Sequence, residues 1–250
     1  MGPVHVPTDV LIILPTYNER ENLPRVVEAL LRAPDRRVLV VDDASPDGTG
    51  AVAEELAGRF PHRVHVLHRT GPRGLGLSYV DGFRHALADG APLICQMDAD
   101  LSHDPEHLPG MIDAAADADL VIGSRYLSGI SVVNWPLRRL VLSILANAYV
   151  RRITGTPVRD CTSGFRCWRR ETLAVLPLRQ LRSNGYAFLV ETLVEAEALG
   201  ARVREVPIVF VERRLGASKL STGVFVESLL TPWRLRLRYV RRRIAALWRP

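Results

Sequence analysis

Two acidic residues separated by one position, Asp98 and Asp100, form the pattern in this sequence with the most direct chemistry. They follow the apolar run LICQM (93–97), which is typical of a buried strand. If the chain bends after that strand, both carboxylates can reach one divalent cation. Oxygen ligands suit Mg²⁺ or Mn²⁺, which commonly bridge to substrate phosphates. A solvated turn is the alternative, because this spacing is frequent by chance. His103 is a candidate third ligand, or else a surface histidine.

A single lysine, Lys219, is present in a chain whose other 32 basic side chains are arginines. This bias suggests a codon usage that replaces lysine by arginine wherever either residue is tolerated. A single lysine can still remain by chance. The alternative is a task that suits a compact charge on a flexible stem, such as binding phosphate oxygens. The Gly-rich stretch GPRGLG (71–76) is not followed by Gly-Lys-Ser/Thr, so we do not expect a nucleotide bound as in P-loop proteins.

The net charge of +6 is confined to the C-terminal end of the chain. Residues 221–250 contain seven arginines and one acid, whereas the preceding 220 residues contain 26 bases and 26 acids. Apolar residues recur in this tail at helical spacing, which is typical of a basic amphipathic helix lying on an anionic membrane surface. They are Phe225, Leu229, Trp233, Leu237, Val240, Ile244 and Trp248, with Pro232 expected to kink or interrupt the helix.

Two alternatives remain for this basic tail. It could pack on the body of the protein with a solvated basic face, or it could bind nucleic acid. The neutral body argues against nucleic acid, as do tryptophans that lie on an apolar stripe instead of alternating with basic residues. We therefore expect no nucleic-acid partner.

The elements that must position these residues alternate along the first half of the chain. Apolar runs predict buried strands at 9–15, 36–45, 63–69, 91–100 and 118–124, and helical patterns lie between them, as at 21–33, 47–60 and 105–116. This order predicts an α/β fold with a mostly parallel sheet and helices on both faces. Polar clusters end three of the strands, at 15–19, 42–45 and 98–100. Ligands bind outside the carboxyl ends of parallel strands, so we expect one site to collect these clusters.

The second half of the chain is less regular. It contains an apolar helix at 137–153, an amphipathic helix at 186–200 and an extended segment at 201–213. The uncharged part of the first helix, 140–150, is shorter than the roughly 20 residues that span a bilayer. The three cysteines are odd in number and lack Cys-x-x-Cys spacing, which favours a reducing compartment. We expect a peripheral protein on the cytoplasmic face of a membrane, without a signal peptide or a transmembrane helix.

Several motifs across residues 9–222 together resemble the family 2 glycosyltransferases. Within that family they are most similar to the polyprenol-phosphate (dolichol-phosphate) mannosyltransferase branch. The motifs are PTYNE (15–19), VVDDASPDGT (40–49), RGLG (73–76), QMDADLSHDPEHLP (96–109), GSRY (123–126), TSGFR (162–166), NGYAF (184–188) and RRLGASKL (213–220).

The resemblance implies a GT-A fold and a transferase. It implies a glycosyltransferase domain over 1–222, with a nucleotide-binding part over about 9–124 and an acceptor-binding part over about 125–222. Residues 223–250 form the basic amphipathic segment outside the match. The implied reaction moves mannose, with inversion, from GDP-mannose to a polyprenyl monophosphate, using Mg²⁺ or Mn²⁺. Sister enzymes transfer another sugar, for example from UDP-glucose, and that alternative stays open. A separate membrane subunit is a further candidate partner.

The resemblance also implies residue roles. Asp98 and Asp100 would hold the metal against the diphosphate, and Arg213 and Lys219 would close over it, which makes these four the catalytic residues. The nucleotide sugar would contact Pro15, Tyr17, Glu19, Asp42, Asp43, Asp98, Ala99, Asp100, Arg213 and Lys219. Arg125, Arg139 and Ser143 would bind the acceptor phosphate.

Two considerations bear on the implied acceptor site. Arg139 and Ser143 are four residues apart and share one face of the 137–153 helix; otherwise Arg139 is a helix-end cation without a partner. A lipid monophosphate is already an anionic nucleophile, so the reaction needs positioning and charge neutralisation more than a general base.

Overall fold

A computed structural model describes residues 9–181, 183, 185–212 and 227–238 of the 250-residue chain. Strands and helices alternate through the first half, as expected from the sequence. The elements are β1 (Val10–Thr16), α1 (Leu23–Leu30), β2 (Arg36–Asp42), α2 (Thr49–Arg59), β3 (Val64–His68), α3 (Leu75–Asp89), β4 (Leu93–Gln96), η1 (Pro105–His107), α4 (Leu108–Ala114), β5 (Leu120–Ser124), β6 (Val132–Val133), α5 (Leu137–Thr154), β7 (Arg166–Arg169), α6 (Arg170–Val175), α7 (Gly185–Ala198), β8 (Val203–Pro207) and β9 (Phe210–Val211). Residues 227–238 form a further helix.

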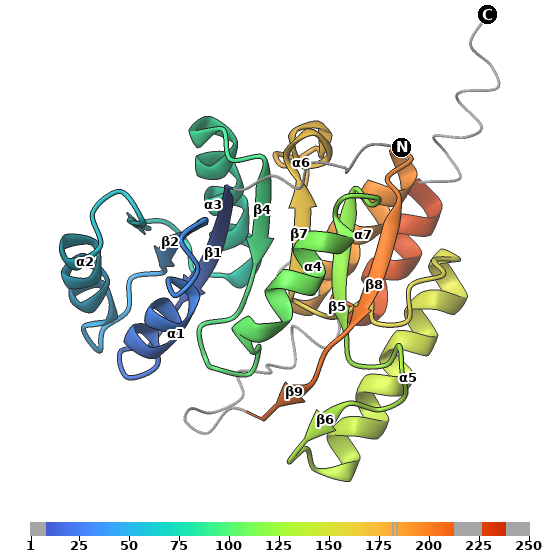
Figure 1. The fold of residues 1–250 in the computed structure, drawn as a ribbon. Helices are drawn as coiled ribbons and strands as arrows, with labels where there is room; N and C mark the ends of the chain where they lie inside the picture. The colour runs from blue at the N-terminus through green and yellow to red at the C-terminus, as the bar shows by residue number, and fades with distance from the viewer. Residues whose placement is uncertain (1–8, 182, 184, 213–226, 239–250) are drawn as a thin grey trace, which may run out of the picture.

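A seven-stranded sheet with the order β3-β2-β1-β4-β7-β5-β8 forms the centre of the molecule (Figure 1). All neighbouring strands are parallel except where β7 runs antiparallel between β4 and β5. The predicted mostly parallel sheet is therefore confirmed. Strand β7 was not predicted, because its four residues, RCWR, carry neither an apolar run nor an alternating pattern.

Side chains of successive strand residues point to opposite faces of the sheet and build two cores. In β1, Val10, Ile12 and Leu14 join the core under α1, α2 and α4, whereas Leu11 and Ile13 join the core under α3, α6 and α7. Figure 1 shows helices on both sides of the sheet, as the sequence predicts. These continuous apolar strands are typical of a sheet that is buried on both faces.

The helix at 227–238 packs on the body through one face only. Leu235 is 1% exposed and belongs to the core under α7, and Arg238 donates to Glu195 Oε1 at 2.7 Å. The apolar side chains of the predicted stripe point the other way: Leu229, Trp233 and Leu237 are 42%, 54% and 58% exposed. The helix continues through Pro232, so the expected interruption is absent from 227–238. Over residues 227–238 the expected packing on the body is therefore confirmed for one face, and the membrane contact of the exposed face stays a prediction.

None of the helices within the described residues has the length and apolar character needed to cross a bilayer. Helix α5 nevertheless exposes several large apolar side chains along its first three turns: Leu137, Val141, Leu142, Ile144 and Leu145.

Candidate active site

A cavity of about 600 Å³ opens at the carboxyl ends of the strands, where the sequence predicts a site. It extends from the ends of β1 and β2, past the end of β4, to α5 and the start of α7. Its lining residues are Pro15, Thr16, Tyr17, Glu19, Asp43, Arg73, Gly74, Leu75, Ser78, Tyr79, Asp98, Ala99, Asp100, His103, Arg125, Arg139, Thr162, Ser163, Gly164, Gly185, Tyr186, Leu189 and Phe210.

Sharp turns of the backbone bring the three predicted polar clusters to this cavity. Positive φ angles of 61° and 55° occur at Asn18 and Ala44, two residues beyond the ends of β1 and β2, and one of 65° occurs at Leu101, directly after Asp100. Residues other than glycine rarely adopt this left-handed conformation, and they keep it only where the surroundings hold it. These turns lie within or directly after the three polar clusters, so the clusters stay at the edge of the sheet.

Asp98 and Asp100 both line the cavity, but their surroundings differ. The Asp98 side chain is 35% exposed, whereas Asp100 is 5% exposed and its Oδ1 accepts a hydrogen bond from the Ser102 amide at 3.0 Å. Beneath Asp98, the fully buried Tyr79 hydroxyl lies 3.5 Å from Asp98 Oδ1. Burial, and then the negative charge of Asp98, raise the pKa of Tyr79, so this hydroxyl stays protonated.

His103 is a buried histidine, so the alternative of a surface residue is wrong. It is 1% exposed, its ring stacks on Phe165 at 5.0 Å, and its Nδ1 accepts the Asp98 amide hydrogen at 3.1 Å. Burial lowers the pKa of His103, against the opposing effect of Asp98 and Asp100. The ring is therefore neutral and fixes the backbone at the start of the acidic pair.

The residues at this point fit a divalent cation that is also held by a substrate. Among the described residues no cluster of three or more His, Cys, Asp or Glu side chains could hold a metal by itself. Two carboxylates nevertheless suit Mg²⁺ or Mn²⁺, which take further oxygen ligands from phosphates and water. The space beside Asp98 is kept open by Gly164, where an added Cβ would lie 3.6 Å from Asp98 Oδ1.

The cavity is lined by Pro15, Tyr17, Glu19, Asp43 and Ala99, five of the residues expected to contact the nucleotide sugar. Arg73, to which the sequence gives no role, lies against Tyr17: its guanidinium is 4.8 Å from the ring centre and donates to the hydroxyl.

Asp43 holds the Gly-rich loop in place. One of its oxygens accepts from the buried Arg69, and the other accepts from the Gly74 amide at 2.8 Å. Asp42 is not among the residues that line the cavity, and its carboxylate accepts hydrogen bonds from Thr16 and Ser45 instead. The structure therefore does not bring Asp42 to the place expected for the nucleoside.

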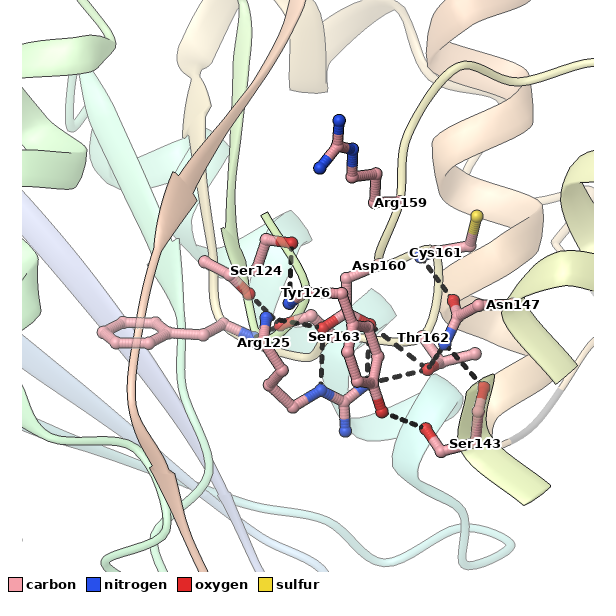
Figure 2. Close-up of polar contacts among 12 residues, drawn as sticks. Ser124, Arg125, Tyr126, Ser143, Asn147, Arg159, Asp160, Cys161, Thr162 and Ser163 are labelled. Carbon is pink, nitrogen blue, oxygen red and sulfur yellow. Dashed lines mark hydrogen bonds and ion pairs between the residues drawn. The ribbon is translucent and has the colours of Figure 1, made fainter. Parts of the chain in front are cut away.

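On the opposite side of the cavity, Arg125 follows β5 and is 5% exposed. Its Nε and Nη2 donate to the two oxygens of Asp160 at 2.7 and 2.6 Å, and Nη2 also donates to Thr162 (Figure 2). Burial alone would lower the pKa of Arg125, but the adjacent Asp160 carboxylate outweighs it and raises the pKa. Within the described residues, Nη1 has no hydrogen-bond partner, so both of its N–H groups remain available at the cavity.

Arg139, on the first turn of α5, also lines the cavity and has two partners, which excludes the alternative of an unpartnered helix-end cation. It forms an ion pair with Glu212, and its guanidinium lies 4.3 Å from the ring centre of Trp135. Ser143 is not among the lining residues; its hydroxyl accepts from Tyr126 at 2.7 Å. Arg213 and Lys219 lie outside the described residues.

The residues that sequence reasoning missed are Arg73, Asp160, Thr162 and Tyr186. The motifs RGLG, TSGFR and NGYAF contain Arg73, Thr162 and Tyr186, and Asp160 lies two residues before TSGFR. The motifs therefore indicated these segments without assigning roles to the residues.

Comparison with known proteins identifies the family to which the chain belongs. The model of the family described as glycosyl transferase family 2 matches residues 11–176. A polyprenol monophosphomannose synthase of Mycolicibacterium smegmatis is 49% identical over 237 residues, covering 93% of this chain and 89% of that protein. An undecaprenyl-phosphate mannosyltransferase of Micrococcus luteus is 47% identical over 233 residues, covering 92% and 96%.

Solved structures show the same architecture. The glucosyl-3-phosphoglycerate synthase of Mycobacterium tuberculosis, in complex with Mn²⁺, uridine diphosphate and phosphoglyceric acid, superimposes with a TM-score of 0.67 at 16% identity, covering 91% of this chain and 78% of that one. The same synthase in complex with uridine diphosphate alone gives 0.63 at 18% identity, with 91% and 80% coverage. At these identities the likeness concerns the fold alone, which is a GT-A-like α/β fold. The chain belongs to glycosyl transferase family 2.

Proposed function

We propose that this glycosyltransferase transfers mannose from GDP-mannose to a polyprenyl monophosphate, with inversion, to give polyprenyl-phosphate mannose and GDP. One observation carries the proposal: a single cavity is lined by a carboxylate pair, Asp98 and Asp100, and by two arginines, Arg125 and Arg139. The first pair suits a metal-bound diphosphate and the second suits a phosphate acceptor. The names of the two relatives, one a polyprenol monophosphomannose synthase and the other an undecaprenyl-phosphate mannosyltransferase, support the lipid acceptor and the sugar.

The proposed donor half binds the nucleotide along the side of the cavity that is lined by Pro15, Tyr17, Glu19 and Asp43. Asp98 and Asp100 would hold Mg²⁺ or Mn²⁺, which neutralises charge on the departing diphosphate when bound. A structural relative that binds Mn²⁺ together with UDP-glucose supports this metal requirement. Lys219 and Arg213 are proposed to add positive charge over the same diphosphate.

The proposed acceptor half needs no general base, because a phosphate monoester is already an anion near neutral pH. Arg125 and Arg139 would orient this anion toward the anomeric carbon, on the side opposite to the leaving diphosphate. The neutral His103 is occupied by the Asp98 amide, so it does not take part as a base in this scheme. Attack from the opposite face gives the inverted, β-linked product.

A transferase for another sugar, such as glucose from UDP-glucose, is the second candidate. It is favoured only by fold neighbours that were solved in complex with UDP-glucose. The decisive experiment incubates the purified enzyme with a short polyprenyl phosphate, Mn²⁺ or Mg²⁺, and radiolabelled GDP-mannose, UDP-glucose or UDP-mannose. We expect lipid-linked product from GDP-mannose alone. Product from UDP-glucose instead would replace the proposed donor, and no product from any donor would overturn the acceptor assignment.

We further propose that the enzyme works at the cytoplasmic face of a membrane as a peripheral protein. The exposed apolar residues of α5 and of the 227–238 helix support a membrane contact, and Arg236, beside them, would face anionic headgroups. A separate membrane subunit is a further partner in this proposal.

A further inference from the structure

Asn147 lies in the middle of α5, is 3% exposed and is the centre of a polar network (Figure 2). Its Oδ1 accepts the Cys161 amide hydrogen at 2.8 Å. Its Nδ2 donates to the Ser143 carbonyl at 3.0 Å and lies 3.3 Å from Thr162 Oγ1. The side-chain amide thus joins helix α5 to the loop at 160–162 through two hydrogen bonds, one to Cys161 and one to Thr162.

The same loop determines the orientation of Arg125. Asp160 is fully buried and accepts three hydrogen bonds from Arg125, one from its amide and two from its guanidinium. The Asp160 amide in turn donates to Glu205 on β8 at 2.9 Å, which fastens the loop to the sheet. Thr162 accepts from Arg125 Nη2 at 2.8 Å, so Asn147 and Arg125 meet at one hydroxyl group.

Helix α5 carries the other cation of the cavity, Arg139, two turns before Asn147. A further contact with α5 is made from the end of β5 by Tyr126, which follows Arg125 and donates to Ser143 Oγ at 2.7 Å. The distance between Arg125 and Arg139 therefore depends on how α5 is attached to the loop and to the end of β5. Asn147 contributes the larger share of these hydrogen bonds.

We propose that Asn147 is a positioning residue for the acceptor phosphate: it sets the spacing of Arg125 and Arg139 by joining α5 to the loop that holds Arg125. This inference rests on the proposed function, because it assumes that the two arginines bind the phosphate of the acceptor. Asn147 itself does not line the cavity and touches no substrate in this scheme. Its effect is on the geometry of the two cations that do.

The test compares steady-state kinetics of wild type and Asn147→Ala with a short polyprenyl phosphate. Because misplacing an orienting group by about 1 Å can cost up to about 100-fold, we expect the KM for the lipid phosphate to rise about tenfold. The KM for the sugar nucleotide should change less than about twofold, since the donor half does not touch Asn147. A loss of folded protein would instead lower the apparent kcat and leave both KM values unchanged.

A matched control is Thr156→Val. Thr156 is buried two residues beyond the end of α5 and donates to Glu197 at 2.6 Å, but it does not line the cavity. Its replacement removes a buried hydrogen bond of similar kind and should leave both KM values within about twofold. An equal rise of the acceptor KM in Thr156→Val would overturn the assignment to Asn147.

A second test uses the variant Arg139→Met. If Asn147 acts by spacing the two arginines, its effect should largely vanish once one arginine is missing. Adding Asn147→Ala to Arg139→Met should then change the acceptor KM less than about twofold. The effects of the two substitutions would therefore not add, as expected for residues that act together. A full tenfold effect in that background would show that Asn147 does not act through the pair.

Inorganic phosphate separates this inference from the proposed function. Its equilibrium binding, followed by ³¹P NMR or calorimetry, reports the anion site without any sugar transfer. If wild type glycosylates no polyprenyl phosphate, the proposed function fails. The inference still stands if Asn147→Ala binds phosphate about tenfold more weakly than wild type. Unchanged phosphate binding in Asn147→Ala would overturn the inference, whatever the wild type transfers.

Discussion

Asp98 and Asp100 are equivalent in the sequence and different in the structure. Asp98 is partly open to the cavity, whereas Asp100 is buried and its Oδ1 is bonded to the Ser102 amide. A test of the metal site must therefore remove the charge of Asp100 without removing that hydrogen bond.

We predict that Asp100→Asn abolishes transfer while the protein stays folded. Asparagine keeps an oxygen for Ser102, but it is a much weaker ligand for a divalent cation than a carboxylate. Loss of one charge-stabilising group in an active site costs roughly 100- to 1000-fold in kcat. Initial rates at increasing Mn²⁺ check this, with thermal unfolding as the control for the fold. Full activity of the variant, or of wild type in excess EDTA, would exclude this metal site.

Lys219 allows a second prediction at the scale of one residue. If its ammonium binds the diphosphate, Lys219→Ala should lower kcat and leave the KM for the lipid phosphate nearly unchanged. Lys219→Arg should restore only part of kcat, because a planar guanidinium places its charge differently from an ammonium. Steady-state kinetics of both variants decide this; wild-type kinetics in Lys219→Arg would leave the single lysine as an accident of codon usage.

The residues of the site that could be predicted are those whose signal is local. Asp98 and Asp100 are two positions apart after one apolar run, so spacing alone brings them together. Arg125 and Asp160 are 35 residues apart, and Arg73 and Tyr17 are 56 apart. Such pairs depend on how strands and loops are arranged in space, so no local sequence pattern predicts them.

At the scale of elements, helix α3 packs against β1 through Gly82. A Cβ added there would lie 2.7 Å from Ile13 Cγ2, closer than atoms approach without a shift of the buried Ile13. Gly58, in α2, offers the contrast, because an added Cβ would have no atom within 4 Å.

We predict opposite effects of alanine at these two glycines. Gly82→Ala should lower the free energy of unfolding by about 1–3 kcal/mol through overpacking. Gly58→Ala should raise it by up to about 1 kcal/mol, since alanine favours the helix. Urea unfolding curves of both variants measure this. If Gly82→Ala is as stable as wild type, the helix and strand can separate more easily than the packing indicates.

The predictions of helices and strands are confirmed where the hydrophobic periodicity is clear, and they miss elements that are short. The helices at 21–33, 47–60 and 186–200 and the first strands are confirmed within a few residues, because each has an extended apolar face. The predicted helix at 105–116 is instead η1 followed by α4, ending at Ala114. β6, β7 and β9 are four residues or fewer, and their conformation depends on partners distant in the chain.

At the scale of the whole molecule, the exposed face of the 227–238 helix gives the membrane proposal a specific test. Trp233 and Leu237 lie on the face away from the body, and full burial of one large apolar side chain contributes about 1.5–3 kcal/mol. Replacing both by serine should therefore weaken binding to vesicles of phosphatidylglycerol and phosphatidylcholine at least about tenfold. Thermal stability and transfer to a short-chain acceptor in detergent should stay near wild type.

The control uses the opposite face of the same helix. Leu235→Ala removes a buried side chain, so it should lower stability by about 2–5 kcal/mol and leave vesicle binding of the folded protein unchanged. Vesicle flotation at increasing salt measures both variants, since salt weakens the arginine contribution and spares the apolar one. Undiminished flotation of the Trp233/Leu237 variant would shift the membrane contact to α5.

The position of β7 has a consequence for how the chain folds during synthesis. β7 lies between β4 and β5, although the ribosome makes it after both. After β4 has been made, about 70 further residues must be synthesised before β7 can pair with its edge. At about 5–20 residues per second this synthesis takes several seconds. In that interval β1 to β4 can already pair with one another, while β5 has no neighbour from the first half. An open strand edge is prone to pair with other chains, so the nascent protein is most vulnerable to aggregation before Arg166–Arg169 emerges.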